Sequence, residues 1–232
     1  MPADASPTPP GAATDEAVYE PMALVVARRL HERIIDGTLP PGAPIRQEAV
    51  AKEFGVSRLP VREALRHLEN EGLVVQRPHS GARVAVLDFE ECVTIYKIRE
   101  RLEPLAFSES IEHLSEEQRA GVVQAAERLE SLTDDHAAWL AADRDFHLAC
   151  YAGIPTPRLL QLIVSYWNTT QHYRRILLST FSERDFEIAH GEHLLIVDAL
   201  LNGEARRGED ILRIAMERSR MRLMQHRELF DR

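Results

Sequence analysis

The chain has 232 residues, of which 44% are hydrophobic, and a formal net charge of −9. This length suits one large domain or two small ones, and two cysteines, Cys92 and Cys150, are too few for a disulfide framework or a cysteine-rich zinc module. No apolar run approaches the ~18–20 residues of a membrane span. Residues 1–17 have neither a basic start nor an apolar core, so they are predicted to be a disordered tail and not a secretory signal. We therefore expect a cytoplasmic protein with no membrane partner.

The charge is distributed unevenly along the chain. Residues 18–86 carry ten Lys and Arg against eight Asp and Glu, whereas residues 87–232 carry eighteen against twenty-six. A polyanion should therefore be attracted to the first part and repelled by the second. The abundance of Ala, Leu, Arg and Glu over aromatic residues favours helices in both parts.

Residues 18–86 show the pattern of three helices and a hairpin. Helical spacing of apolar residues predicts a helix over 19–36, a second over QEAVAKEF that ends at Gly55, and a third over 58–71. Ser57 can cap the third helix with its side chain. The run LVVQRPHSGARVAV then predicts two strands joined by a glycine-containing loop. This order is typical of a winged helix-turn-helix domain, which places one helix in the major groove of DNA.

The third predicted helix carries Arg58, Arg62 and Arg66 on one row, four residues apart. Like charges at this spacing destabilise an isolated helix by about 0.2–0.5 kcal/mol per pair, so a compensating partner is expected. DNA phosphates supply one, and an arginine near the start of the helix can bind guanine with two hydrogen bonds. The alternative is a solvated helix face without a partner. The glycine turn, Ser57 and the hairpin in register favour DNA binding.

This region resembles the DNA-binding domain of the GntR family of bacterial transcriptional regulators. The resemblance covers nearly all of residues 24–86 and is carried by the runs IIDGTLPPG, GVSRLPVREAL and LENEGL. It implies contacts to double-stranded DNA, with support from the tip of the wing. The residues assigned to DNA contact on this basis, with Arg66 added as a phosphate contact, are Arg46, Ser57, Arg58, Arg62, Arg66, His79 and Gly81.

Residues 87–232 show no strand-like alternation and predict six helices, near 89–112, 116–132, 135–152, 157–179, 183–202 and 205–228. The expected fold class is mainly α: a winged helix-turn-helix with a small β-hairpin wing over 18–86, then an all-α bundle over 87–232. The bundle resembles the FCD effector-binding and dimerisation domain of the FadR subfamily of GntR regulators, in its six-helix, VanR-like form. The matching runs are IRERLEPLA at 98–106, DRDFH at 143–147 and EHLLIVDAL at 192–200.

Asp143 and His147 lie four residues apart, so they project from one face of a predicted helix. With His193 they offer one oxygen and two nitrogen ligands, a set that suits zinc, nickel or manganese. The family resemblance implies a third histidine ligand where this chain has Ser219, a poor ligand for these ions; His190, one turn from His193, could substitute for it. The alternative is an Asp–His hydrogen-bonded pair that lines a pocket for an organic ligand.

The resemblance also implies that Arg99 points inward and holds a carboxylate group of the effector, in the same pocket as the Asp143 cluster. The alternative for Arg99 is a salt bridge with Glu103, four residues further on. The remaining histidines of the bundle match no motif and are predicted on the surface: His113, His136 and His172.

The sequence thus predicts a transcriptional regulator, not an enzyme, whose homodimer binds a palindromic DNA operator. A small organic acid, or its metal chelate, is expected to bind the bundle and relieve repression by favouring a dimer that no longer fits the half-sites. The rival hypothesis is a metal-dependent hydrolase or isomerase that uses the Asp143 cluster. It lacks a further acid or base, because Glu192 is predicted to point away from His193. A nonspecific nucleoid-packing protein is disfavoured by the acidic second half.

Overall fold

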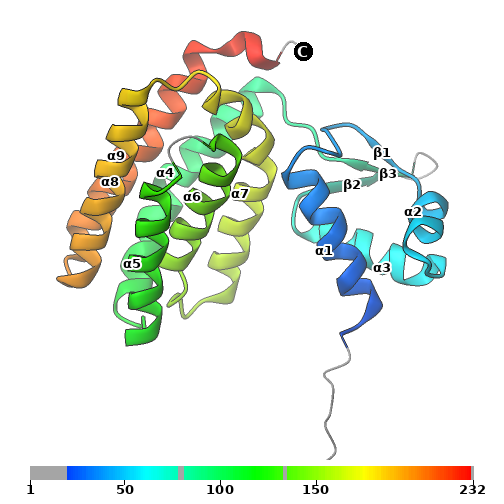
Figure 1. Ribbon diagram of the computed structural model, residues 1–232, viewed down its shortest axis with the longest axis horizontal. Helices are drawn as coiled ribbons and strands as arrows, with labels where there is room; N and C mark the ends of the chain where they lie inside the picture. Colours follow the sequence, from blue (N-terminus) through cyan, green and yellow to red (C-terminus); the bar gives the residue numbers. More distant parts are fainter. Residues whose placement is uncertain (1–19, 78–80, 133–134, 231–232) are drawn as a thin grey trace, which may run out of the picture.

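The computed structural model describes residues 20–77, 81–132 and 135–230 (Figure 1). Within these ranges the fold is mainly α, with a small antiparallel sheet in the first half and a helical bundle in the second, as predicted. The tail predicted over residues 1–17 lies outside the described residues. No helix in these ranges is long and apolar enough to cross a membrane.

The first half contains α1 (Met22–Ile35), α2 (Gln47–Phe54) and α3 (Arg58–Asn70), with the short strands β1 (Pro44–Ile45), β2 (Val74–Arg77) and β3 (Gly81–Val84). The strands form an antiparallel sheet in the order β1-β3-β2. The three predicted helices and the hairpin are present. Strand β1 was not predicted, because two residues are too few to show a period. Aliphatic side chains from α1, α3 and the sheet form the core of this half, among them Val26, Leu30, Val61, Leu65, Leu68, Val74 and Val84.

The turn between α2 and α3 depends on Gly55, which ends α2 with a φ of 67°. Glycine adopts this left-handed conformation without the steric penalty of a side chain. Ser57 occupies the N-cap position of α3, but its side chain makes no capping hydrogen bond, so the predicted cap is wrong in this respect. Helix α3 is held instead by its buried face, as at Val61 and Leu65.

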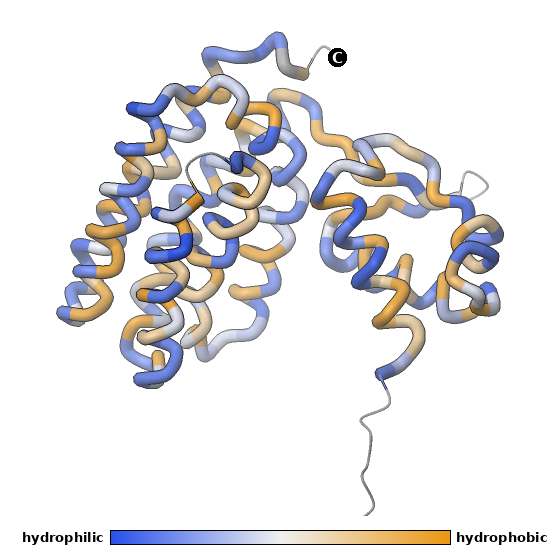
Figure 2. The backbone as a smooth tube through the Cα atoms, in the orientation of Figure 1, coloured by the Kyte–Doolittle hydropathy of each residue, from blue (hydrophilic) through white to orange (hydrophobic). Residues whose placement is uncertain are grey.

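The second half contains α4 (Phe89–Ile111), α5 (Glu116–Glu130), α6 (His136–Cys150), α7 (Pro157–Leu178), α8 (Glu183–Leu201) and α9 (Ala205–Gln225), followed by a 3₁₀ turn over Arg227–Phe230. All six predicted helices are confirmed. Hydrophilic and hydrophobic residues are intermixed along the helices of the bundle, as expected for helices with one buried face (Figure 2). The largest side chains buried between the helices include Phe107, Phe146 and Trp167.

The two halves meet along α7. The Tyr173 hydroxyl accepts a hydrogen bond from the Leu87 N–H (2.9 Å) and donates one to the Leu87 carbonyl (2.6 Å), which fixes the segment between the wing and α4. The Asn168 side-chain amide donates to the carbonyl of Glu71, the residue that ends α3 (3.4 Å). Helix α7 therefore contacts both the linker before α4 and the end of α3.

The end of the described chain folds back on this junction. The Phe230 ring stacks on the Tyr173 ring with centroids 4.6 Å apart, and it meets the Phe89 ring edge-on at 5.4 Å. The carboxyl-terminal turn thus covers the tyrosine that holds the two halves together.

Candidate DNA-binding surface and ligand pocket

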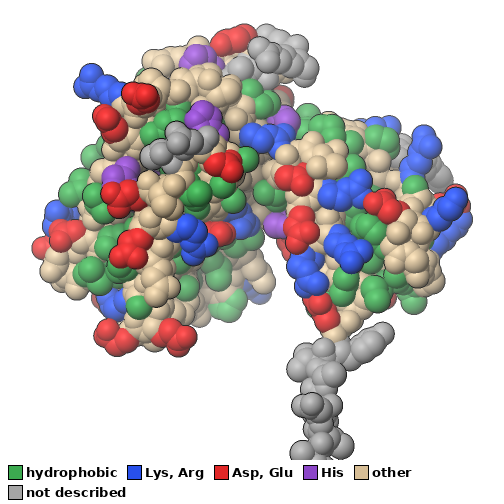
Figure 3. All heavy atoms as spheres, viewed as in Figure 1, with side chains coloured by type: hydrophobic (Ala, Val, Ile, Leu, Met, Phe, Trp, Pro, Cys, Tyr) green, Lys and Arg blue, Asp and Glu red, His purple; other side chains and the backbone are tan. Residues whose placement is uncertain are grey.

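The row of arginines lies on the outer face of α3. Arg58, Arg62 and Arg66 are exposed, because the opposite face of the helix packs into the core of the first half. Lys and Arg side chains are interspersed with Asp and Glu over this half, on the right in Figure 3. Arg58 forms an ion pair with Glu48, in the first turn of α2, a partner that spacing along α3 does not predict.

The other residues predicted to contact DNA are exposed where they are described. Arg46 is exposed at the N-cap position of α2, and Ser57 is exposed directly before α3. Gly81 begins β3 with a φ of 73° and is exposed. His79 lies outside the described residues.

A cavity of about 50 Å³ lies inside the bundle, between α4, α6, α7, α8 and α9. It combines aromatic and aliphatic walls with charged groups of both signs. Its charged, imidazole and hydroxyl side chains are Tyr96, Arg99, Asp143, His147, Arg174, Glu192, His193, Arg218 and Ser219. Concave sites with a few convergent polar groups are typical of small-molecule binding.

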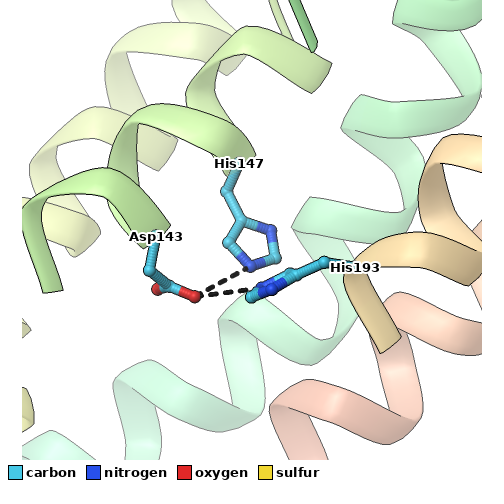
Figure 4. Close-up of side chains that lie close together, drawn as sticks. All are labelled: Asp143, His147 and His193. Atoms are coloured by element: carbon cyan, nitrogen blue, oxygen red, sulfur yellow. Dashed lines mark ion pairs between the residues drawn. The ribbon is translucent and has the colours of Figure 1, made fainter. Parts of the chain in front are cut away.

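Asp143, His147 and His193 converge in this cavity, as predicted (Figure 4). The Asp143 Oδ1 atom lies 3.0 Å from His193 Nε2 and 3.8 Å from His147 Nε2. One ligand atom from each residue lies within 4.8 Å of the others. These three donors fit a divalent cation, because their oxygen and nitrogen atoms already face one another.

The protonation states in this cluster also suit a cation. Burial alone would raise the pKa of Asp143, but the charge of Arg174, which pairs with its other carboxylate oxygen, and the two histidines hold it well below its usual range. Burial lowers the pKa of His147 to about 4, so its imidazole is neutral near pH 7. An ionised carboxylate and a neutral imidazole are the forms that bind metals.

Among the described residues, no strong fourth ligand for a metal ion joins Asp143, His147 and His193. Ser219 lines the cavity, and its hydroxyl donates to the Ala215 carbonyl at 3.0 Å. His190 does not substitute for a third histidine ligand, because its ring lies 3.9 Å from Glu130, outside the group of converging donors. Within the described residues the donor set is therefore one carboxylate and two imidazoles.

Arg99 lies in the cavity wall and also forms the ion pair that was the alternative. Its Nε donates to Glu103 Oε1 at 2.5 Å and its Nη1 to the Thr170 hydroxyl at 3.2 Å. Its guanidinium lies 4.2 Å from the Trp167 ring centroid. The second Glu103 oxygen accepts from the Tyr151 hydroxyl at 2.8 Å. Arg99 is thus held inside a buried network.

The sequence analysis did not identify Arg174 and Arg218 as residues of the cavity, and it placed Glu192 outside the cavity. Arg174 pairs with Asp143 and lies 4.2 Å from the Trp167 ring centroid. Arg218 donates to Glu192 at 2.5 and 3.0 Å. The prediction that Glu192 points away from this site was wrong: it directly precedes His193, and its side chain lines the cavity and pairs with Arg218. No motif marks either arginine, because both are defined by packing between helices.

His172 was predicted on the surface and is instead half-buried where α7 faces the first half. The guanidinium of Arg175 donates to its Nδ1 atom at 3.0 Å. His113 and His136 are exposed, as predicted.

The stability of the protein should depend on pH through His172. Burial, and next the charge of Arg175, lower its pKa from 6.5 to about 4. Between these values the unfolded chain binds a proton that the folded protein does not, so stability falls as the pH drops through this window. Because the ring is partly exposed, the expected contribution is on the order of 1 kcal/mol.

Urea denaturation across this window tests the expectation. The His172→Gln variant should lose part of the pH dependence of the unfolding free energy, whereas His113→Gln, a change at an exposed histidine, should retain all of it. Equal pH dependence in the wild type and His172→Gln would contradict the assignment.

Known proteins share both halves of the chain. Residues 22–84 match "Bacterial regulatory proteins, gntR family" and residues 94–218 match the FCD domain. The uncharacterized HTH-type transcriptional regulator YdhC of Bacillus subtilis (strain 168) is 32% identical over 71% of this chain and 74% of its own length. The probable D-xylose utilization operon transcriptional repressor of Paenarthrobacter nicotinovorans is 32% identical over 77% of this chain and 78% of its own.

The fold is shared with solved structures. E. coli McbR/YncC superposes with a TM-score of 0.76 at 24% identity, covering 88% of this chain and 97% of that chain. The relatives are described as transcriptional regulators and repressors, which gives the hydrolase or isomerase alternative no support. The chain therefore belongs to the GntR family, with an FCD effector-binding domain behind its helix-turn-helix domain, and it is a DNA-binding transcriptional regulator and not an enzyme.

Proposed function

We propose that this protein is a cytoplasmic repressor whose homodimer binds a palindromic operator and is released by a small organic acid. The observation that carries the proposal is the pairing of two features in one chain. The exposed arginine row of α3 offers a surface for a duplex, and the bundle encloses a cavity with guanidinium groups in its wall. Residues 18–86 act as the DNA-binding domain and residues 87–232 as the effector-binding and dimerisation domain.

A band-shift experiment tests the DNA side of this proposal. DNA upstream of the protein's own gene should be shifted at lower protein concentration than random duplex, and an effector should reverse the shift. The effector is sought by a thermal-shift screen of carboxylic acids, because a ligand that binds the folded state raises the melting temperature. Failure to shift any duplex at low salt would contradict the proposal.

Exposed apolar side chains on the bundle support a homodimer. A two-fold interface uses the same patch on both copies and is richer in apolar groups than the remaining surface. Large exposed apolar residues lie on α4, α8 and α9, namely Leu105, Leu194, Leu201, Ile214 and Met221. Sedimentation equilibrium should give twice the chain mass.

The cavity supports an anionic ligand. Arginine binds carboxylates through two parallel hydrogen bonds. Arg99 lines the cavity while paired with Glu103, and Arg174 and Arg218 line the same cavity and are less buried. We propose that the effector binds between Arg99, Asp143, His147 and His193, with the two further arginines holding its carboxylate groups.

We also propose that the cavity takes one zinc, nickel or manganese ion. Asp143, His147 and His193 would hold it through Oδ1 and the two Nε2 atoms that already face one another. A bound ion supplies a fixed positive charge for an oxygen of the effector. Asp143 is kept ionised for this role by Arg174 on its other oxygen.

Replacing Ser219 by histidine should strengthen metal binding. The variant restores a third imidazole at the cavity wall, so its affinity for Zn²⁺ should rise by roughly tenfold or more. Isothermal titration with ZnCl₂ measures the change. The control His190→Gln should bind Zn²⁺ as the wild type does, because His190 lies outside the donor group. If neither the wild type nor Ser219→His binds Zn²⁺, Ni²⁺ or Mn²⁺, the metal proposal fails.

Helices α6 and α7 offer a route from the cavity to the DNA. Asp143 faces the cavity, and the next residue, Arg144, donates to the Asn168 side chain at 2.8 Å. Asn168 in turn donates to the Glu71 carbonyl at the end of α3. A ligand that moves α6 or α7 would therefore shift the DNA-binding helix, given a different affinity for the two arrangements.

Removing the Asn168 side chain should uncouple the two halves. For a carboxylic acid that stabilises the wild type, Asn168→Ala should keep the rise in melting temperature and lose at least half of the effect of that acid on DNA affinity. The matched control is Asn202→Ala, at the exposed end of α8. Full retention of the acid's effect in Asn168→Ala would show that the coupling runs elsewhere.

A further inference from the structure

An acidic side chain lies on the surface that should meet DNA. Glu48 and Arg58 form an ion pair across the turn between α2 and α3, and their side chains are 73% and 67% exposed. Arg62 and Arg66 lie on the same row, and within the described part of the chain neither has an acidic partner. The carboxylate is therefore directed at one arginine of the three, the one at the start of the helix.

Neither folding nor overall affinity for DNA explains this placement. An exposed ion pair contributes little to stability, since solvent screens it and two long side chains must be ordered. A carboxylate beside a duplex also opposes binding, because it adds a negative charge close to the phosphates. The remaining candidate role for Glu48 is to restrain the Arg58 side chain through their ion pair.

The geometry of the guanidinium group shows how the ion pair with Glu48 would restrain Arg58. A guanidinium has five N–H donors in a planar fork, and a carboxylate occupies only part of them. The remaining donors point away from Glu48, and the side chain has fewer rotamers to lose when DNA binds. The Glu48 carboxylate repels a phosphate that approaches the free edge of Arg58, whereas the two guanine acceptors carry no net charge and can still be bound there.

We propose that Glu48 is a specificity-determining residue that positions Arg58 to bind a base and not the DNA backbone. Glu48 acts through Arg58 and need not touch DNA itself. It lowers the affinity for random duplex by its charge and sharpens the base preference at the position that Arg58 contacts. Both effects raise the ratio of the affinity for the operator to the affinity for random duplex.

The alternative role for Glu48 is a structural one, as an acid that favours the N-terminus of α2. That role would change stability without changing which base is preferred. The two roles are separated by measuring base preference directly, by selection of bound sequences from a pool of random duplexes. The experiment uses the full chain and needs no effector.

The test variant is Glu48→Gln, which removes the charge and keeps the shape. Its affinity for the random pool, followed by fluorescence anisotropy at several salt concentrations, should rise about threefold or more, with a steeper salt dependence as Arg58 becomes free to contact a phosphate. The sequences that it selects should show a weaker preference at one base pair of each half-site. The ratio of affinities for wild-type-selected DNA and random DNA should fall about fivefold or more.

Two controls complete the design. Glu53→Gln makes the same charge change on the same helix, at an exposed acid that pairs with Arg33 at 2.9 Å, and it should leave base preference unchanged. In an Arg58→Ala background, Glu48→Gln should have no further effect on base preference. Equal effects of the two glutamine variants, an unchanged base preference in Glu48→Gln, or an additive effect in the Arg58→Ala background would each overturn the proposal. A wild-type protein that selects no sequence would overturn it together with the proposed operator binding.

Discussion

Replacing Arg58 by alanine is expected to reduce sharply the preference of the protein for its operator over random DNA. Arg58 is exposed at the first residue of α3, the end of a recognition helix that faces the bases. The loss of a bidentate contact to guanine should lower discrimination at that base pair by about 1–3 kcal/mol. Competition band shifts with operator and single-base variants measure the change.

The matched control is Arg66→Ala, two turns further along the same exposed row. It removes the same side chain and charge, but from a position predicted to contact a phosphate. Binding should weaken by a similar factor for all sequences, and the salt dependence should flatten by about one unit of slope. Equal loss of specificity in both variants would contradict the division of roles between the two arginines.

Replacing Glu103 by alanine is expected to lower the free energy of unfolding by about 3–5 kcal/mol. Arg99 is 1% exposed, and Glu103 is its only acidic partner in the described part of the chain. Burial opposes the charge on Arg99, but Glu103 outweighs it and raises the pKa of the guanidinium, so a charge would remain buried without compensation. The Tyr151 hydroxyl would lose its acceptor as well.

Urea denaturation measures this loss, and two further variants locate its cause. Glu109→Ala, at an exposed position of the same helix, should change the unfolding free energy by less than about 0.5 kcal/mol. The double variant Arg99→Met with Glu103→Leu should regain most of the loss, because no unpaired charge is left in the core. A double variant as unstable as Glu103→Ala would show that packing, and not the unpaired charge, is responsible.

The features that could be predicted from the sequence are those that depend on the spacing of residues within one helix or turn. Helix α3 buries Val61, Ala64, Leu65 and Leu68, a spacing of three and four residues that can be read directly from the chain. Gly55 ends α2 in the conformation that glycine favours. The pair Asp143 and His147 follows from the same periodicity, and the family resemblance added His193, which the structure brings beside them.

The features that were missed depend on contacts between helices. Arg174 reaches Asp143 from α7, Arg218 reaches Glu192 from α9, and Glu48 reaches Arg58 from α2. The angle and distance between two helices decide such pairs, and neither is encoded in the spacing within one of them. The same limit explains His172, whose burial comes from the other half of the chain.

The contact between Phe230 and Tyr173 has a practical consequence for work with this protein. The Phe230 ring belongs to the final described turn. The Tyr173 hydroxyl, beneath this ring, is hydrogen-bonded to both the main-chain N–H and the carbonyl of Leu87. A purification tag or reporter fused to the carboxyl end would lie close to this contact. Operator affinities should therefore be compared with the fusion cleaved off, since loss of the Phe230 contact would weaken the support of the tyrosine that holds Leu87.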